Sequence, residues 1–306
     1  MASNKTIGSG ETLNRVLGQS ESTMQGLTVE TMIDQEPEQL EQWAAEEGWN
    51  PGLHDVEIIR RIEPDAFLAL KLDGEMIGGA VATLNHGYFG FTGLFIVQPA
   101  LRGQSYGSVL WNALSDRLDQ GLFSGAGRGL EGNLEMLPFY SRQGYALDYR
   151  HIRYQGAFFG IRHPSLVDLG AIPFDEIVRF DTLHVPHSRA DFIEPWIQQS
   201  GAVALGILEE GSLAGYGVAR PTRNGYKVGP LFAKDVFLAE RILSGLAEGV
   251  WGARLQIDVP ELNSIALEMI ESLGFERVFD CGRMYKGPKP LLPTPCIFGT
   301  TSLEFG

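Results

Sequence analysis

A short loop between a hydrophobic strand and a helix carries the residues best suited to binding a phosphate. Leu94–Val97 reads as the end of a strand, and the loop Arg102–Gly107 leads directly into a helix. Such a loop points successive backbone N–H groups into one concavity, and the helix N-terminus adds positive potential. Arg102 adds a charge, and Gly103 and Gly107 permit close approach of a phosphate. The segment predicts a pyrophosphate site, although a plain strand-to-helix turn is also often rich in Gly.

This loop resembles the acetyl-CoA loop of the GNAT superfamily of N-acetyltransferases. Arg102, Ser105 and Gly107 match its three spaced positions, with Ser105 where the family most often has Gly. Asn133 and Tyr140 match a second GNAT signature at the expected spacing. The resemblance covers about residues 27–288 and implies that acetyl-CoA is the acyl donor.

The resemblance also implies which residues hold the cofactor. The pantetheine arm is expected to pair with the strand edge at Phe95, Ile96 and Val97, where a backbone N–H would hold the thioester carbonyl. Serine satisfies the loop if the φ angle of Ser105 stays negative. The remaining cofactor-binding residues that the resemblance implies are Arg102, Gly103, Gln104, Ser105, Tyr106, Gly107 and Asn133.

Two side chains are candidates for catalysis, and each has a second interpretation. The resemblance implies that Tyr140 protonates the departing CoA thiolate, and the alternative is a core aromatic beside Phe139. Glu131 could take the proton that an alkylammonium, with a pKa of about 10.4, must lose before it attacks a thioester. Otherwise Glu131 is a solvated carboxylate. Trp49 and Asn50 either line the acceptor pocket or form a turn with one buried Trp.

Hydrophobic periodicity places these residues on a regular series of elements. Strands are predicted at 27–32, 66–72, 76–84, 88–97 and 146–154, and helices at 36–47, 55–62, 108–118 and 134–143. Asp73–Gly74 between two strands predicts a hairpin turn.

The second half of the chain repeats the first. Asp73–Gly74 and Glu210–Gly211 lie 137 residues apart, and Asn133 and Asn263 lie 130 apart. We therefore predict an α/β (α+β) fold of two tandem GNAT domains, each a mixed, mostly antiparallel sheet flanked by helices. The predicted divisions are a flexible segment 1–25, a GNAT domain 26–156 with the acetyl-CoA loop, a linker 157–175, a GNAT-like domain 176–288 and an irregular tail 289–306.

The second copy lacks the residues needed for cofactor chemistry. Its third strand runs through Ala233–Asp235 into a helix with no Gly in the turn, and Ile270 stands where the first copy has Tyr140. We expect this domain to complete the acceptor site or to stabilise the first domain through an apolar interface.

Composition narrows the possible partners. The net charge is −14, so a phosphodiester backbone would be repelled and nucleic acid is not expected. No run of apolar residues is long enough to span a bilayer, so no membrane partner is expected. Cys281 and Cys296 are the only cysteines, which favours a cytoplasmic, reducing compartment. The six histidines show no metal spacing, so no metal is predicted.

Two function classes remain open. The first is an N-acetyltransferase that moves the acetyl group of acetyl-CoA directly to a primary amine in a ternary complex, without a metal. The amine would belong to a small molecule or a peptide. The alternative is a non-catalytic acetyl-CoA sensor or interaction module, which Ser105 and the degenerate second copy favour and Tyr140 disfavours. The sequence does not determine the oligomeric state.

Overall fold

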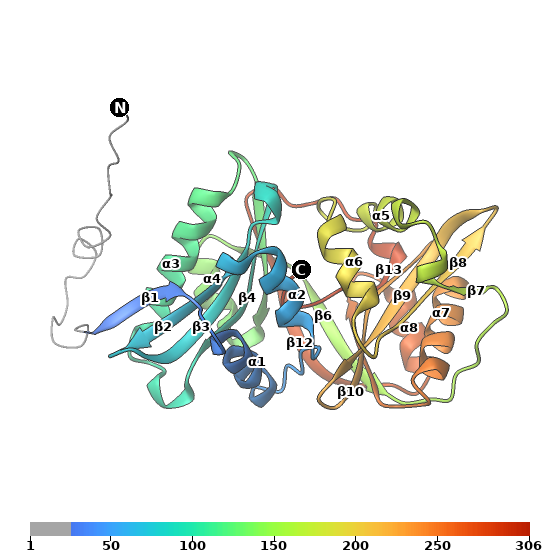
Figure 1. Ribbon diagram of the computed structural model, residues 1–306, viewed down its shortest axis with the longest axis horizontal. Coiled ribbons are helices and arrows are strands. Elements are labelled where there is room, and N and C mark those ends of the chain that lie inside the picture. Colours follow the sequence, from blue (N-terminus) through green and yellow to red (C-terminus); the bar gives the residue numbers. More distant parts are fainter. Residues whose placement is uncertain (1–25) are drawn as a thin grey trace.

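A computed structural model describes residues 26–306, and its strands form one continuous sheet that runs through both halves of the chain (Figure 1). The strand order is β1-β2-β3-β4-β5-β12-β6-β11-β10-β9-β8-β7, and β13 pairs with β10. Most neighbouring strands are antiparallel, and helices α3 and α7 pack against the first and second halves of the sheet. The predicted mixed α/β fold is confirmed. The predicted flexible segment 1–25 lies outside the described residues.

The predicted elements of the first half agree with the observed ones to within about three residues, except that the predicted helix over 134–143 divides in two. Strand β5 was not predicted. Short 3-10 turns (η) join several of the elements. In chain order the elements are β1 (Leu27–Thr31), α1 (Glu36–Glu46), α2 (Asp55–Ile62), η2 (Pro64–Ala66), β2 (Phe67–Leu72), β3 (Glu75–Thr83), η3 (Asn85–Gly87), β4 (Phe89–Val97), η4 (Pro99–Leu101), α3 (Tyr106–Gly121), β5 (Gly127–Asn133), η5 (Leu134–Met136), α4 (Leu137–Arg142) and β6 (Ala146–Gly156).

The second half repeats this pattern and contains elements that were not predicted from the sequence, namely β7, α5, α6, β12 and β13. Strand β7 lies within the predicted linker and pairs with β8. In chain order the elements are β7 (Leu166–Asp168), η6 (Leu169–Ala171), α5 (Phe174–Thr182), α6 (Ala190–Gln198), β8 (Val203–Glu209), β9 (Ser212–Thr222), β10 (Gly225–Ala233), α7 (Val236–Gly249), β11 (Leu255–Pro260), α8 (Ser264–Ser272), β12 (Glu276–Lys286), η7 (Thr294–Cys296) and β13 (Ile297–Gly299).

Equivalent hairpins in the two halves use the same turn. Asp73 and Gly74 have φ angles of 52° and 86°, and Glu210 and Gly211 have φ angles of 51° and 81°. Two consecutive residues with positive φ are typical of a type I′ turn, whose twist matches that of the flanking strands. The turn geometry therefore supports the internal repeat.

The two halves exchange their last long strands. Strand β12 pairs with β5 on one side, with Cys281 opposite Asn133, and with β6 on the other, with Cys281 opposite His151. Strand β6 in turn pairs with β11 of the second half, with Tyr154 opposite Ile257. Because β5 and β6 do not pair with each other, each half-sheet is completed by a strand from the other half. The predicted domain boundaries follow the order of the chain, whereas the strand pairing joins residues on both sides of the boundary between the two halves.

The C-terminal tail is more ordered than the irregular segment we predicted. It contains β13, which pairs with β10, and it then continues onto the first half of the chain. A Cβ atom at Gly93 of β4 would lie 1.8 Å from the carbonyl oxygen of Glu304, so only glycine allows this approach. Leu303, Glu304 and Phe305 are buried. The tail therefore forms part of the wall between the two halves.

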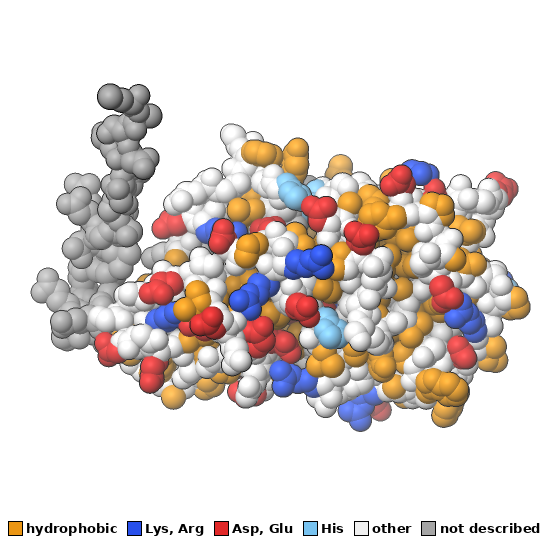
Figure 2. All heavy atoms as spheres, viewed as in Figure 1, with side chains coloured by type: hydrophobic (Ala, Val, Ile, Leu, Met, Phe, Trp, Pro, Cys, Tyr) orange, Lys and Arg blue, Asp and Glu red, His pale blue; other side chains and the backbone are white. Residues whose placement is uncertain are grey.

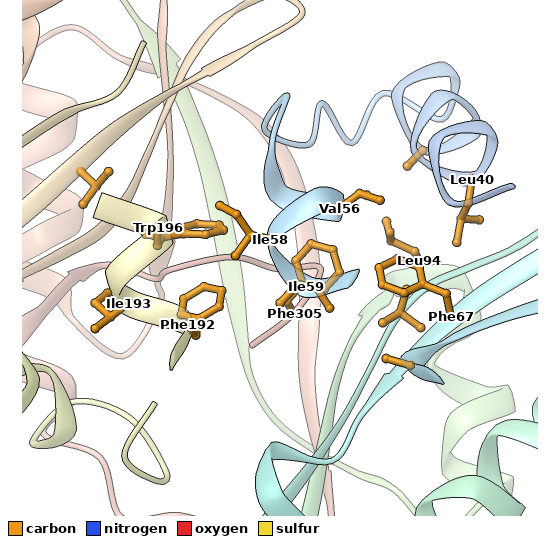
Figure 3. Packing of buried hydrophobic residues seen from close by; sticks show 14 of the residues in the cluster. Leu40, Val56, Ile58, Ile59, Phe67, Leu94, Phe192, Ile193, Trp196 and Phe305 are labelled. Carbon is orange, nitrogen blue, oxygen red and sulfur yellow. The ribbon is translucent and has the colours of Figure 1, made fainter. Parts of the chain in front are cut away.

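An apolar interface joins the halves, as the sequence predicted. Helix α2 lies between α6 and the first half-sheet, with Ile58 facing Trp196 and Ile59 close to Phe305 (Figure 3). These side chains belong to one buried cluster that also contains Leu94 of β4. Since buried apolar area is the main favourable term in association, the two halves should fold as one unit.

Buried ion pairs also cross the interface. Arg220 of β9 contacts Asp55 of α2 at 2.9 Å, and both side chains are fully buried. On the surface, Lys and Arg side chains lie scattered among Asp and Glu on the face that Figure 2 shows. Within residues 26–306, no helix is both long and apolar enough to cross a membrane.

Candidate active site

Strand β4 turns away from β5 halfway along its length. The two strands pair in parallel only from Phe89 opposite Gly127 to Thr92 opposite Leu130. Beyond this point Leu94 has a φ angle of 48°, and the register with β3 shifts by one residue. A bulge of this kind bends a strand and ends its pairing. The result is a cleft of about 480 Å³ between residues 92–97 of β4 and the end of β5.

The loop before α3 supplies a row of free backbone donors at one end of this cleft. Within the described chain, the N–H groups of residues 103–107 donate to no backbone or side-chain acceptor, whereas that of Ser108 donates to Ser105. Gly103 has a φ angle of 77°, and a Cβ atom at Gly107 would lie 3.6 Å from the Phe95 ring. Successive unpaired N–H groups at a helix N-terminus form a good anion site.

Ser105 does not meet the condition of a negative φ angle. Its φ angle is 67°, in the left-handed region. It is the N-cap residue of α3, yet its side chain caps no N–H group. A left-handed conformation costs a non-glycine residue roughly 1–2 kcal/mol. The loop therefore has the geometry that explains why glycine is usual at this position, and this chain forms it with strain.

Ser105→Gly should therefore stabilise the protein. Relief of roughly 1–2 kcal/mol of strain, less roughly 0.5–1 kcal/mol for the greater backbone entropy of unfolded glycine, leaves a net gain of about 0.5–1 kcal/mol. The measurement is the free energy of unfolding in urea. Ser108→Gly is the matched control, because Ser108 lies inside α3 and the change should destabilise by about 0.5–1 kcal/mol. A Ser105→Gly protein less stable than wild type would contradict the strain argument.

Arg102 makes contacts that the sequence could not indicate. Its Nε donates to the carbonyl oxygen of Val97 at 2.9 Å, and its Nη2 is in close contact with a carboxylate oxygen of Glu47. The guanidinium therefore ties the loop both to β4 and to the segment after α1. It remains exposed on its outer side, where an incoming phosphate could compete with Glu47.

Tyr140 lies on α4 at the opposite wall of the cleft. Its ring packs against Trp111 and Phe139, with centroid distances of 5.3 and 5.4 Å. The close approach of its ring to β5 requires glycine at position 132, where a Cβ atom would lie 2.8 Å from Cε2. Burial raises the pKa of Tyr140 well above its usual range. The phenol is both a core aromatic and a cleft residue, and it keeps its proton at neutral pH.

Glu131 sits at the point where β4 and β5 separate, and three side chains surround its carboxylate. Nδ1 of His151 lies 2.8 Å from Oε1, Nε of Arg283 contacts the same oxygen, and Sγ of Cys281 lies 3.2 Å from Oε2. Burial would raise the pKa of Glu131, but Arg283 and His151 outweigh it and hold the pKa below its usual range. The carboxylate is therefore ionised and not solvated.

The ligand atoms of Glu131, His151 and Cys281 lie within 4.8 Å of one another, a spacing that a metal ion could bridge. The sequence analysis did not anticipate this group, because its members come from β5, β6 and β12. The Arg283 guanidinium already places a positive charge against the same carboxylate. Burial and the nearby Glu131 raise the pKa of the Cys281 thiol well above its usual range.

The cleft brings together all of the predicted site residues except Gln104, Ser105 and Tyr106. Those three belong to the same loop but do not line the cleft, and the Tyr106 side chain is buried in the core. Trp49 lines the cleft, as one of its two interpretations required. Asn50 does not, because its amide donates to Thr222 and Gln256 at the interface.

The far wall of the cleft consists of residues that the sequence analysis missed. Arg153 comes from β6, Phe279 and Cys281 from β12, and Leu303 and Glu304 from the tail. The repeat offset of 130 residues relates Arg153 to Arg283 and His151 to Cys281, and that was the only sequence signal for any of them. Nothing local marks Leu303 or Glu304, which reach the site through the path of the tail.

Comparisons with known proteins agree with this arrangement. Residues 32–145 match the family described as the acetyltransferase (GNAT) family, and residues 177–299 match an acetyltransferase (GNAT) domain. The chain belongs to the GNAT family. Both halves are GNAT domains, which confirms the tandem organisation predicted from the repeat.

Similar proteins are known in sequence and in structure. A holothin acyltransferase from a Pseudoalteromonas species is 26% identical over 276 residues, covering 87% of this chain and 90% of that protein. A candidate acetyltransferase from Pyrococcus horikoshii has a TM-score of 0.76 and 24% identity over 92% of this chain and 96% of its own. A tandem GNAT protein from the clavulanic acid biosynthesis pathway has a TM-score of 0.62 and 14% identity over 87% and 99% of the two chains.

Together these findings identify the chain as a GNAT acyltransferase, which uses an acyl-CoA donor and an acceptor substrate. The enzyme class is therefore established in preference to the non-catalytic module. The structural likenesses support the fold alone.

Proposed function

We propose that this GNAT protein transfers the acetyl group of acetyl-CoA to a primary amine of a small molecule, in a ternary complex formed at the β4/β5 cleft. One observation supports this most strongly. The loop before α3, through Gly103 and Gly107, the unpaired edge of β4 and the Tyr140 phenol all border the same cleft. These are the groups needed for a pyrophosphate, a pantetheine arm and a leaving thiolate.

In this proposal the first half of the chain binds the donor. The pyrophosphate lies on Arg102–Gly107, with Asn133 nearby, and the pantetheine arm runs along Phe95–Val97 as an additional strand. A backbone N–H of β4 polarises the thioester carbonyl and stabilises the oxyanion that forms on attack. Tyr140 donates its proton to the CoA sulfur, and Glu131 accepts the proton that the attacking nitrogen loses.

The relative named for holothin supports a small-molecule acceptor in preference to a peptide. Leu303 and Glu304 of the buried tail form part of the cleft wall. The second half of the chain, whose loop before α7 has no glycine, supplies walls and binds no second donor.

Acetyl-CoA should stabilise the full-length protein against heat through the loop before α3. A ligand at about 100 times its Kd stabilises by about 2.7 kcal/mol. Arg102→Glu places a negative charge beside the pyrophosphate and should weaken binding at least about tenfold, or about 1.4 kcal/mol. Lys234→Glu is the matched charge reversal at the equivalent turn of the second half, where Lys234 is exposed, and should leave the thermal shift unchanged. A thermal shift that survives in Arg102→Glu but is lost in Lys234→Glu would disprove the proposed donor site.

A further inference from the structure

The charged side chains at the acceptor end of the cleft are already paired with one another. This end is formed by Glu47, Trp49, Arg153, Phe279, Leu303 and Glu304. Glu47 contacts Arg102, and Arg153 is paired with Asp258 at 2.6 Å. Glu304 lies 3.1 Å from Lys227, and both are buried. Each carboxylate at this end therefore has a cationic partner, but the partner of Glu47 is Arg102, which the donor phosphate would also contact.

Glu131 lies where β4 and β5 separate, and its carboxylate is also already paired. His151 from β6 and Cys281 and Arg283 from β12 face it, and Tyr149 of β6 lies beside His151 at a ring distance of 5.1 Å. The remaining cleft carboxylate, Glu135, is exposed in η5 beside Asn133 and Met136, where water screens its charge.

The pairing of Glu131 with Arg283 is part of the strand exchange and not an isolated feature of the site. Arg153 and Arg283 are 130 residues apart, the offset of the repeat, and each forms a buried ion pair with a carboxylate on the neighbouring strand of the other half. The Arg153–Asp258 pair joins β6 to β11 of the second half, which has no donor loop. Such a pair is stable only while both partners stay charged and in contact.

An alkylammonium would therefore be bound poorly at the acceptor end. It would lose its hydration, while the buried carboxylates of Glu131 and Glu304 are already paired with Arg283 and Lys227. It would also need a strong base, whereas Glu131 is held ionised by Arg283 and is a weak one. A neutral amine carries no charge that must be desolvated, and it needs no base before it attacks.

The walls of the acceptor end favour a flat apolar ring. Trp49 and Phe279 are both half-buried aromatic residues on the cleft, and the buried Leu303 adds an apolar surface. Arg153 lies over the Phe279 ring at 5.5 Å, which fixes that ring in place. Aromatic side chains of this kind bind aromatic ligands by offset stacking or edge-to-face contact.

Building on the proposed function, we infer that the acceptor is an aromatic or heteroaromatic amine that is neutral at pH 7 and binds between Trp49, Phe279 and Leu303. Alkylammonium compounds such as polyamines or lysine side chains are poor acceptors. Glu131 is then not needed to deprotonate an alkylammonium. It only accepts a proton from the nitrogen after that nitrogen has attacked the thioester.

The proton balance agrees with this choice. When the neutral nitrogen attacks the thioester carbon, a C–N bond forms and the nitrogen becomes acidic, so even a weak carboxylate base such as Glu131 accepts its proton. The C–S bond then breaks, and the thiolate takes the phenolic proton of Tyr140. Water returns the proton held by Glu131 to the phenolate, which leaves the enzyme as it began and yields an amide and CoA.

The test compares 4-methylaniline with benzylamine, which are isomers of nearly equal size but are respectively neutral and charged at pH 7. With saturating acetyl-CoA and full-length protein, we expect kcat/KM for 4-methylaniline to be at least about tenfold higher at pH 7 and flat between pH 6.5 and 8.5. For benzylamine, kcat/KM should rise about tenfold per pH unit, because only its free base reacts.

Benzylamine used as well as 4-methylaniline at pH 7 would overturn the inferred acceptor class and leave the proposed acetyltransferase function intact. Acetylation of neither amine, with acetyl-CoA binding retained, would overturn both. The two failures are therefore distinguishable.

Two substitutions test the ring contacts. Trp49→Ala and Phe279→Ala should each raise KM for 4-methylaniline about tenfold and leave the Kd for acetyl-CoA unchanged. Trp251→Ala and Phe237→Ala are matched controls, because these side chains are 89% and 68% exposed and lie outside the cleft, and they should change KM less than about twofold. An unchanged KM in both cleft variants would overturn the proposed ring site.

Discussion

Tyr140→Phe should lower kcat by roughly 10²–10⁴ while the Kd for acetyl-CoA changes little. The substitution removes one hydroxyl group and keeps the ring that packs against Trp111 and Phe139. Burial keeps the phenol protonated at neutral pH, so the wild-type residue has a proton to donate when the C–S bond breaks. Thiol release from acetyl-CoA measures kcat, and calorimetry measures the affinity for the donor.

Tyr145→Phe is the matched control for this experiment. Tyr145 is buried against the same Trp111 ring at 5.8 Å, and burial raises its pKa to about 12, yet it does not line the cleft. Its loss of a hydroxyl group should change kcat less than about threefold. If Tyr140→Phe also left kcat unchanged, Tyr140 would be a core aromatic only, and the proton for the thiolate would have to come from water.

A fragment of residues 1–160 should neither fold cooperatively nor show activity. It retains β6 but lacks β12 and β11, the two strands with which β6 pairs, and β5 loses its partner β12. The fragment also exposes Arg153 and His151, which are buried in the intact chain. Unpaired strand edges beside an exposed apolar surface lead to aggregation. Circular dichroism during heating and size-exclusion chromatography would measure folding and association.

Cleavage without removal of the second half provides the control. A protease site inserted near His163, in an exposed part of the connection between β6 and β7, leaves every strand in place. After cleavage the two pieces should stay associated and retain activity, because β6 and β12 still cross between them. A monodisperse 1–160 fragment with a cooperative melting transition and full activity would show instead that the second half is an independent module.

Local sequence determined much of this protein. The period of apolar residues located nearly every helix and strand of the first half, and α2 was predicted at its observed bounds, Asp55–Ile62. Asp73–Gly74 specified a type I′ turn, because both residues tolerate positive φ. The resemblance carried by Arg102, Gly107, Asn133 and Tyr140 implied donor-binding and catalytic residues, and these four residues line one cleft. The helix bounds and the turn depend on contacts between residues close in the chain.

Other features were decided only by tertiary structure. Strand pairing depends on contacts between distant residues, and the periodicity of β6 and β12 is the same whether each pairs within its own half or is exchanged. The contacts of Glu131 with His151, Cys281 and Arg283 therefore had no local signal, and they bury the carboxylate, which excludes the solvated alternative. The loop likewise imposes the left-handed conformation of Ser105, which serine by itself does not favour. Leu303 and Glu304 reach the cleft because Gly93 lets the tail approach β4, a fit that exists only once both halves have folded together.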